Sequence, residues 1–336
     1  MNNLIKKIIK HGEICEQIIT EFNVHQSINR DKELKSNSRF SVEILEGGIG
    51  PGSFLLTLHK FDSKKVILKV AEWISTPEDH NRIKTQLDNI ISMNKVSPLV
   101  SEVYGYFEAA DKYMVIVEYV EAVDPVHPSY KDHQLLIDIG LDSYKSAHKW
   151  KEQNSGYSID TDDTTLVETL DYGIAPYKKD WPKELLGEHY NKVFDFLSKA
   201  LETLNSQSFK DYYNSSLTFI HRDIHITNIV MSPEGPRLID FENAGIDNPL
   251  IEITRPLIIF IPPEEFPTLL EKAKNNAFKV ISDIEKRYFD KMVLMDILAC
   301  TSYELEYIET CDDPVKVDMA KRIIEQRFGY LKYFCN

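Results

Sequence analysis

The sequence predicts an α+β protein with two parts, a small sheet-containing part followed by a larger, mainly helical part. Strand-forming residues dominate positions 40–120, and helical periodicity dominates the chain after Tyr119. Two apolar runs flank a polar loop near position 223. The 336 residues suffice for two domains, at roughly 150 residues each. We therefore expect one domain over residues 1–118 and another over residues 119–336.

The first part is predicted to contain an N-terminal helix, five strands and a second helix. Residues 1–22 alternate apolar and charged residues at helical spacing and lack the unbroken apolar core of a signal peptide. The five strand segments are FSVEILEGG, GSFLLTLHKF, KKVILKVAEW, SEVYGYFEA and KYMVIVEYV. Between the third and fourth, residues 75–94 begin with Ser, Thr and Pro, which is typical of a helix start. The apolar residues of this helix share one face: Ile83, Leu87, Ile90 and Ile91.

Five segments of the second part carry helical periodicity. They are HQLLIDIGLDSYKSAHKW, EHYNKVFDFLSKALETLNSQSF, PEEFPTLLEKAKNNAFKVISDIEKRYF, KMVLMDILACTSYELEYIET and PVKVDMAKRIIEQRFGYLKYF. Between the first two, residues 151–183 contain Gly156, two prolines and an acidic run. Such a composition favours a long loop or insertion, either as a solvated face or as a cover over a substrate.

The composition disfavours several classes of function. Lys and Arg number 39 against 53 Asp and Glu, a net charge of −14, which is unsuited to neutralising nucleic-acid phosphates. The cysteines form no CxxC pair, so neither a disulfide framework nor a zinc ribbon is indicated. The apolar run PLIIFIPPEEF is broken by two prolines and is too short to span a bilayer. We therefore expect a soluble, cytoplasmic protein whose partners are neither nucleic acid nor a membrane.

The segment TFIHRDIHITNIVMSPEGPRLIDFENAG carries the most chemical information. An apolar strand enters a polar loop with the pattern DxxxxN, at Asp223 and Asn228, and a later strand ends in Asp240. Mg²⁺ prefers oxygen ligands and binds through one or two side chains plus substrate phosphates, so Asn228 and Asp240 would be its protein ligands. Asp223 is then free to bind an attacking hydroxyl. This pattern predicts phosphoryl transfer from a nucleotide.

The same segment resembles the catalytic loop and metal-binding strand of the kinase superfamily, most closely those of aminoglycoside phosphotransferases and choline kinase-like enzymes. Five residues carry the resemblance: His221, Asp223, His225, Asn228 and Asp240. It implies a two-lobed protein-kinase-like fold, with a small antiparallel-sheet lobe and a larger, mainly helical lobe, that binds ATP or GTP with Mg²⁺ between the lobes. It also implies that Asp223 and His225 are catalytic, with His225 directed at the transferred phosphate.

Two features of the first part fit this expectation. A kinase needs a cation on the central strand of its small sheet to contact the phosphates, and VILKV offers Lys69. The turn between the first two strands is rich in glycine, which lets backbone amides contact phosphates. Its residues are Gly47, Gly48, Gly50, Gly52 and Ser53. Taken alone, a strand lysine is usually solvated and a glycine-rich hairpin is often a plain β-turn.

Other expected parts match less closely. The segment KYMVIVEYVEA resembles the strand and hinge that join the lobes, where adenine would bond to the backbone near Glu118 and Val120. Any buried strand that enters a loop gives the same pattern. The family's glutamate partner for Lys69 has no clear counterpart, since Glu78 fits a helix-start charge. Glu252 stands where the family carries an aspartate.

Three other classes of function share features with this sequence. The HxxxH spacing of His221 and His225 would suit a zinc hydrolase, but Arg222 stands where zinc proteases carry glutamate, so Arg222 is expected to be a structural or surface contact. A protein kinase is disfavoured because no Ala-Pro-Glu-like element follows Asp240. A non-catalytic pseudokinase is disfavoured because the lysine, the catalytic aspartate and both metal ligands are retained.

The predicted reaction transfers a γ-phosphoryl group to a hydroxyl of a small molecule. The acidic balance and the run Asp160–Asp163 are compatible with a cationic acceptor, such as an aminoglycoside or a choline-like amino-alcohol. Aromatic residues of the same part would equally suit a sugar or a quaternary amine. They are Trp150, Tyr157, Tyr172, Tyr177 and Trp181. A neutral metabolite such as a sugar or homoserine fits as well.

Overall fold

The computed structural model describes residues 40–45, 53–58, 64–73, 77–109, 112–123, 132–156, 164–172, 178, 183–184, 187–241, 243–259, 261–311 and 314–335. Their contacts divide them into two compact units. The first unit contains the described residues of Met1–Pro125 and Val230–Glu242. The second contains those of Val126–Ile229 and Asn243–Asn336.

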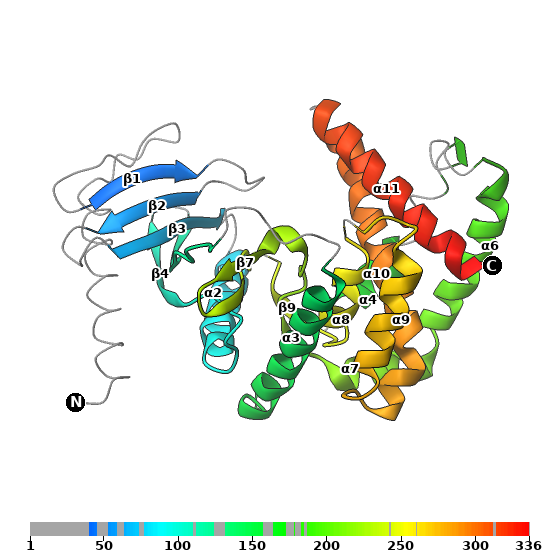
Figure 1. The fold of residues 1–336 in the computed structure, drawn as a ribbon, viewed down its shortest axis with the longest axis horizontal. Helices are drawn as coiled ribbons and strands as arrows, with labels where there is room; N and C mark the ends of the chain where they lie inside the picture. The colour runs from blue at the N-terminus through cyan, green and yellow to red at the C-terminus, as the bar shows by residue number, and fades with distance from the viewer. Residues whose placement is uncertain are drawn as a thin grey trace. The chain divides into compact units, whose positions relative to one another are not determined.

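The first unit is built on an antiparallel sheet of five strands (Figure 1). Their bounds are β1 (Phe40–Leu45), β2 (Ser53–Leu58), β3 (Lys64–Trp73), β4 (Val103–Ala109) and β5 (Lys112–Glu118). They lie in the order β1-β2-β3-β5-β4. Alternate residues of the inner strands are fully buried, as strand periodicity requires: Leu56, Leu58, Val66, Leu68 and Ile116. The five predicted strands are confirmed.

Helix α2 (Pro77–Asn94) separates β3 from β4 in the chain and packs on β4. Pro77 occupies its first position, where a missing backbone N–H costs no helical hydrogen bond. Ile83, Leu87 and Ile90 are buried, as the sequence predicts, whereas Ile91 is half-buried. The helix therefore contributes one apolar face to the core of the first unit.

A hairpin from later in the chain completes the first unit. Its strands are β7 (Ile229–Ser232) and β8 (Gly235–Leu238). The backbone N–H of Leu238 donates to the Leu99 carbonyl at 2.7 Å, and the Leu238 carbonyl accepts from the Ser101 hydroxyl at 2.9 Å. These bonds fix the end of β8 to the segment between α2 and β4, only two residues before Asp240.

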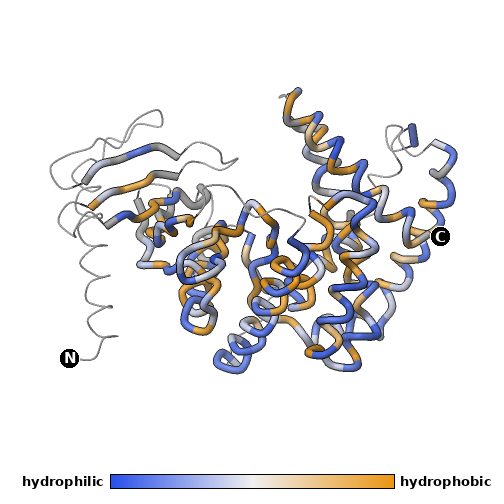
Figure 2. Tube along the Cα trace, in the orientation of Figure 1, coloured by the Kyte–Doolittle hydropathy of each residue, from blue (hydrophilic) through white to orange (hydrophobic). Residues whose placement is uncertain are grey.

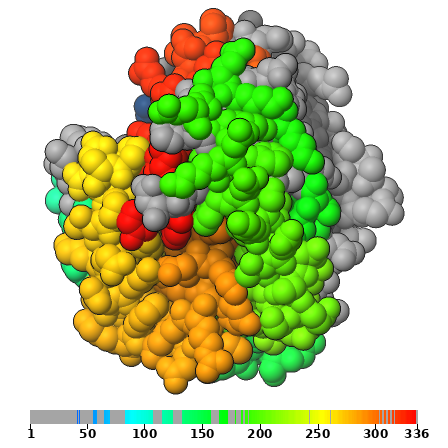
Figure 3. Space-filling model, turned by 90° about the vertical axis from the view of Figure 1, so that its right-hand side faces the viewer, coloured from blue at the N-terminus to red at the C-terminus, as the bar shows by residue number. Residues whose placement is uncertain are grey.

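The second unit is mainly helical, as predicted. Its helices are α3 (His133–Gln153), α4 (Thr165–Tyr172), α6 (Tyr190–Leu204), α7 (Gln207–Ser216), α8 (Ile251–Thr254), α9 (Phe266–Ala277), α10 (Asp283–Thr310) and α11 (Pro314–Cys335). Strands β6 (Thr218–Ile220) and β9 (Gly245–Asp247) pair antiparallel. Hydrophobic and hydrophilic positions interchange along the helices (Figure 2), and α10 lies between α9 and α6 on one face of this unit (Figure 3). Within the described residues, no helix is long and apolar enough to cross a membrane.

Two helical segments differ from the predicted ones. The helix expected over residues 263–289 is interrupted, because α9 stops and α10 starts separately. The Ser282 hydroxyl accepts from the Glu285 backbone N–H, while the Glu285 carboxylate accepts from the Ser282 backbone N–H. This capping box begins a new helix. Helix α4 lies within residues 151–183, which the sequence analysis assigns to a loop.

Helices α3 and α8 approach each other closely at Gly140. A Cβ atom on Gly140 would lie 2.8 Å from the backbone oxygen of Glu252 and 3.3 Å from the Cα of Ile253. Both atoms belong to the backbone of α8, which cannot rotate away as a flexible side chain can. Only glycine therefore permits this helix packing without displacement of α8.

We expect Gly140→Ala to lower the free energy of unfolding. Overpacking costs about 1–3 kcal/mol, against a gain of at most roughly 1 kcal/mol from helix propensity. Urea unfolding measures the effect. The control is Gly156→Ala, because nothing lies within 4 Å of a Cβ built there. A Gly140→Ala protein as stable as the control would contradict the close approach.

Candidate active site

Lys69 and Asp240 form an ion pair in the first unit. Lys69 lies on β3 opposite Val115 of β5. Its Nζ atom is 2.6 Å from Oδ1 of Asp240. The two side chains are 33% and 35% exposed, so a ligand can reach both. The sequence analysis could not assign an acidic partner to Lys69. In the structure this partner is Asp240, which the sequence analysis predicts as a metal ligand.

Asp240 and Arg222 share a rare backbone conformation. Among the described residues, they are the two non-glycine residues with positive φ, at 65° and 66°. Such a conformation costs about 1–3 kcal/mol and persists only where surrounding contacts hold it. Both residues belong to the segment for which the sequence predicts phosphoryl transfer. Strain of this kind is common at functional sites.

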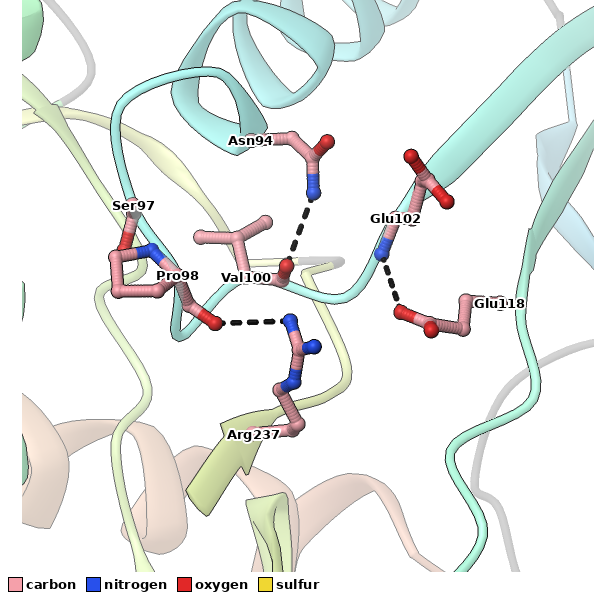
Figure 4. Close-up of a pocket in the computed structure, with 7 residues that line it drawn as sticks. All are labelled: Asn94, Ser97, Pro98, Val100, Glu102, Glu118 and Arg237. Atoms are coloured by element: carbon pink, nitrogen blue, oxygen red, sulfur yellow. Dashed lines mark hydrogen bonds between the residues drawn. The ribbon is translucent and has the colours of Figure 1, made fainter. Parts of the chain in front are cut away.

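Glu118 is the last residue of β5 and Val120 lies two residues further along the chain, and both are half-buried. The Glu118 carboxylate accepts from the backbone N–H of Glu102 at 3.1 Å. A cavity of about 250 Å³ opens beside these two glutamates (Figure 4). It is also lined by Asn94, Ser97, Pro98, Val100 and Arg237. Glu118 therefore directs its side chain to this cavity, whereas the predicted adenine contact concerns its backbone.

In the second unit, β6 leads into the polar loop that contains Asp223. The backbone N–H of Asp223 donates to His221 Nδ1 at 3.3 Å. Asn228 Nδ2 donates to the Asp223 carbonyl at 3.0 Å and lies 3.0 Å from His225 Nε2. Asn243 Nδ2 donates to Oδ2 of Asp223 at 3.1 Å. The loop thus brings Asp223, His225 and Asn228 together. Asn243, which the sequence analysis does not identify as a site residue, also contacts Asp223.

The Asp223 carboxylate is held in its ionised form. Burial by itself raises the pKa of this carboxyl group, but the hydrogen bond and charge of His225 and the charges of His221 and Arg255 lower the pKa well below its usual range. Such a carboxylate holds a proton weakly. It therefore suits the orientation of a hydroxyl, with late proton transfer, better than early proton abstraction.

Glu252 of α8 positions the loop through a buried carboxylate that is 1% exposed. Oε1 accepts from the backbone N–H of Arg222 at 3.0 Å, and Oε2 accepts from the Ser143 hydroxyl of α3. Burial raises the pKa of Glu252 to about 7, although these hydrogen bonds oppose the shift. The sequence analysis left the role of this residue open, and the structure makes it a positioning residue for the loop.

The Arg222 side chain has a second anchor at Asp247, a fully buried residue of β9. Arg222 Nε lies 3.0 Å from Asp247 Oδ2, which also accepts from the Thr165 backbone N–H at 2.9 Å. The Tyr213 hydroxyl donates to the other oxygen. Arg222 is therefore a structural contact, and α4 is joined to the loop through Asp247. The sequence offered no signal for this network, because its members are far apart in the chain.

Some predicted residues lie outside the described part of the chain. They are Gly47, Gly48, Gly50 and Gly52 of the predicted phosphate loop, residues 1–22, the run Asp160–Asp163, and Tyr157, Tyr177 and Trp181. The Ser53 backbone begins β2, and Tyr172 ends α4. Trp150 is 1% exposed and packs on Phe219 with ring centroids 5.7 Å apart. Trp150 therefore belongs to the core and is not available to an acceptor.

The predicted site residues are divided between the two units. Lys69 and Asp240 lie in the first unit. Asp223, His225 and Asn228 lie in the second. Each group is brought together within its own unit. The convergence of both groups on one cleft stays a prediction.

The donor atoms of Asn228 and Asp240 suit Mg²⁺. The hydrogen bonds of the Asn228 amide use its nitrogen, which leaves the amide oxygen for a ligand. Lys69 contacts one carboxylate oxygen of Asp240, which leaves the other. Hard oxygen ligands that supplement substrate phosphates are what Mg²⁺ binding requires. In the described residues, no three His, Cys, Asp or Glu side chains gather into a metal site.

Solved structures with a similar fold include a choline kinase, an amicoumacin kinase and an aminoglycoside phosphotransferase. Choline kinase from Cryptosporidium parvum Iowa II has 13% identity and a TM-score of 0.58, with 95% of this chain and 97% of that chain covered. Amicoumacin kinase hAmiN has 12% identity and a TM-score of 0.55, with coverage of 85% and 87%. An aminoglycoside phosphotransferase from Alicyclobacillus acidocaldarius has 13% identity and a TM-score of 0.51, with coverage of 92% and 97%. The fold is therefore protein-kinase-like, as predicted.

A family model described as the phosphotransferase enzyme family matches residues 86–283, which is more than half of the chain. The chain belongs to this family. No curated protein sequence matches it.

We expect Glu252→Gln to change how stability depends on pH. The pKa of Glu252 is about 7 in the folded protein against 4.5 ordinarily. The native state therefore holds a proton that the unfolded chain releases between these values, and the wild type loses stability as pH rises through this window. The total loss is roughly 3 kcal/mol. Gln cannot ionise. The free energy of unfolding should therefore fall more between pH 4.5 and pH 7.5 in the wild type than in Glu252→Gln. The same change in both proteins would contradict the shifted titration.

Proposed function

We propose that the protein transfers the γ-phosphoryl group of ATP or GTP to a hydroxyl group of a small molecule, with Mg²⁺ as the required ion. The observation that carries this proposal is the arrangement of Asp223, which accepts hydrogen bonds from Asn228 and Asn243, in a chain of the phosphotransferase enzyme family. Residues 1–118 form the lobe that binds the nucleotide phosphates, and residues 119–336 form the lobe that binds the acceptor. We place this activity in the cytoplasm.

In the proposed reaction, Asp223 accepts a hydrogen bond from the acceptor hydroxyl and aligns its oxygen with the γ-phosphorus. The bond between that phosphorus and the bridging oxygen breaks, a bond to the acceptor oxygen forms, and the nucleoside diphosphate leaves. The hydroxyl proton passes to an oxygen of Asp223. His225 points to the transferred phosphate. Because Asn228 and Asn243 fix the orientation of the Asp223 carboxylate, Asp223 does not have to change its rotamer before the transfer.

On the nucleotide side, Lys69 contacts the phosphates, and Gly47, Gly48, Gly50, Gly52 and Ser53 cover them. The backbone near Glu118 and Val120 binds the base. Bound Mg²⁺ would neutralise charge on the phosphate oxygens, with Asn228 and Asp240 as its protein ligands. The structure of amicoumacin kinase that shares this fold is a complex with AMP-PNP and Ca²⁺, which supports a nucleoside triphosphate and a divalent cation here.

The first test is Asp223→Asn. The amide keeps the shape of the side chain but cannot accept the proton, so turnover should fall by roughly 10²- to 10⁴-fold, while nucleotide affinity stays nearly unchanged. The measurement is the rate of ADP release with aminoglycosides, amino-alcohols, amino acids and sugars as acceptors. Asp142→Asn is the control, because Asp142 is an exposed residue of α3. Full activity of Asp223→Asn would refute its role.

The second test is Asp240→Ala. It removes a proposed metal ligand and the partner of Lys69, so Mg²⁺-dependent nucleotide binding should be lost together with turnover. Calorimetric titration with AMP-PNP is carried out with Mg²⁺ and with EDTA, for the variant and for Asp142→Asn. A Mg²⁺ dependence equal to that of the wild type would exclude Asp240 as a ligand.

A further inference from the structure

The first turn of helix α4 is buried and is held by residues from outside the helix. Thr165 and Leu166 are 1% and 4% exposed. The backbone N–H groups of the first turn of a helix have no partner within the helix. Here that of Thr165 donates to Oδ2 of Asp247 at 2.9 Å, and that of Leu166 donates to the Tyr213 hydroxyl at 3.2 Å. The start of α4 therefore belongs to the core of the second unit, which is neither of the roles that the sequence analysis considers for residues 151–183.

One carboxylate oxygen of Asp247 joins α4 to the loop that contains Asp223. Oδ2 of this fully buried residue also accepts from the Thr165 hydroxyl at 2.7 Å, and Arg222 Nε lies 3.0 Å from the same oxygen. A buried carboxylate needs such donors, because burial without them is costly. A displacement of α4 would therefore move or unpair the oxygen that holds Arg222.

Arg222 is held at its backbone and along its side chain, and it directly precedes Asp223. Its φ of 66° requires external contacts in an L residue. Its backbone N–H donates to Glu252 Oε1 at 3.0 Å. Its side chain lies against Gly245 of β9, where an added Cβ atom would be 3.0 Å from Nη1 and 3.4 Å from Cδ of Arg222. A shift of the guanidinium group would therefore strain the backbone next to Asp223.

We propose that helix α4 positions the Asp223 carboxylate for phosphoryl transfer through the shared anchor at Asp247. This inference rests on the proposed function and makes Thr165, Asp247 and Arg222 positioning residues of that reaction. All of these residues belong to the second unit. The three positioning residues act through Asp223, whose alignment with the acceptor hydroxyl they maintain. A misplacement of about 1 Å at a reacting group reduces a rate by on the order of 100-fold, so small shifts of the loop have large effects on turnover.

Two substitutions of Thr165 separate its hydrogen bond from its packing. Thr165→Val keeps the shape of the side chain and removes the hydroxyl donor, whereas Thr165→Ser keeps the donor and removes a methyl group. With Mg²⁺-ATP and a saturating acceptor, kcat should fall by on the order of 10-fold in Thr165→Val and by less than about 2-fold in Thr165→Ser. The KM for ATP should change by less than about 2-fold in both, because the predicted phosphate contacts lie in the first unit.

The matched control is Thr203→Val, because the Thr203 hydroxyl donates within α6, to the Lys199 carbonyl. This variant should keep the kcat of the wild type. If Thr165 acts only by packing, Thr165→Ser is the slower of the two Thr165 variants. That order, or equal kcat values in both variants, overturns the proposal.

A double variant tests whether α4 acts through Arg222. Arg222→Met removes the guanidinium group from Asp247 and should lower kcat by roughly 10- to 100-fold, whereas Arg222→Lys keeps a cation and should retain more activity. Adding Thr165→Val to Arg222→Met should lower kcat by less than about 2-fold further, because both substitutions interrupt one route. Independent effects that multiply would overturn this route.

A smaller perturbation keeps the test valid where a variant at a buried position fails to fold. The three atoms nearest to a Cβ built on Gly245 all belong to the Arg222 side chain. Gly245→Ala therefore displaces this side chain without removing a donor, and it should lower kcat by roughly 3-fold with little change in the KM for ATP. An unchanged kcat in this variant and in Arg222→Met would contradict the role of Arg222.

Hydrogen exchange measures the position of the loop without turnover. The backbone N–H groups of Arg222 and Asp223 donate to Glu252 and His221. Deuterium uptake by the peptide that contains both groups should rise in Thr165→Val and stay at the wild-type level in Thr165→Ser, because only the first variant loosens the anchor of the loop. Mass spectrometry of the full chain with AMP-PNP and Mg²⁺ bound provides this measurement.

The outcomes separate this inference from the proposed function. Transfer by the wild type, with kcat and uptake unchanged in Thr165→Val, overturns the inference alone. Raised uptake in Thr165→Val, without transfer by the wild type to any acceptor, supports the positioning of the loop by α4 and overturns the proposed function. Unchanged uptake together with absence of transfer overturns both.

Discussion

The position of the loop that contains Asp223 depends on two buried carboxylates that bind Arg222. Glu252 accepts its backbone N–H, and Asp247 pairs with its guanidinium. Arg222 has a positive φ, which L residues adopt only when other contacts enforce it. Burying a carboxylate without hydrogen-bond partners is costly, so the contacts with Arg222 stabilise both carboxylates in addition to fixing the loop. Asp223 is the next residue along the chain, so the two contacts of Arg222 also fix its position.

Asp240 is fixed by a different part of the molecule. The backbone bonds of Leu238 join the end of β8 to the segment after α2, and the chain then reaches Asp240 and its partner Lys69 on β3. The carboxylate thus depends on the sheet of the first unit, although it lies far along the chain from it. The orientation of Lys69 is thus tied to the carboxylate that the sequence analysis predicts as a metal ligand.

The sequence predicted what local patterns encode. The alternation in β1–β5 and the apolar face of α2 predicted these elements, and the resemblance carried by the pattern around Asp223 implied the protein-kinase-like fold. The break between α9 and α10 was also readable, since Ser282 and Glu285 form a capping box within four residues. The pairing of Lys69 with Asp240 and the contact of Asn243 with Asp223 were not, because tertiary packing brings these residues together. Helix α4 is only 8 residues long, too short for periodicity to define it.

The ion pair between Lys69 and Asp240 also determines the charge that this part of the first unit exposes. Each side chain neutralises the other, so the free protein exposes neither a lone cation nor a lone anion at this place. In the proposed reaction, arrival of the metal-bound nucleotide replaces one balanced arrangement by another, with the lysine turned to phosphate and the aspartate to metal. The chain carries an excess of 14 negative charges, which would repel a nucleotide. Because Lys69 neutralises Asp240, the approaching nucleotide does not meet an unpaired carboxylate at this position.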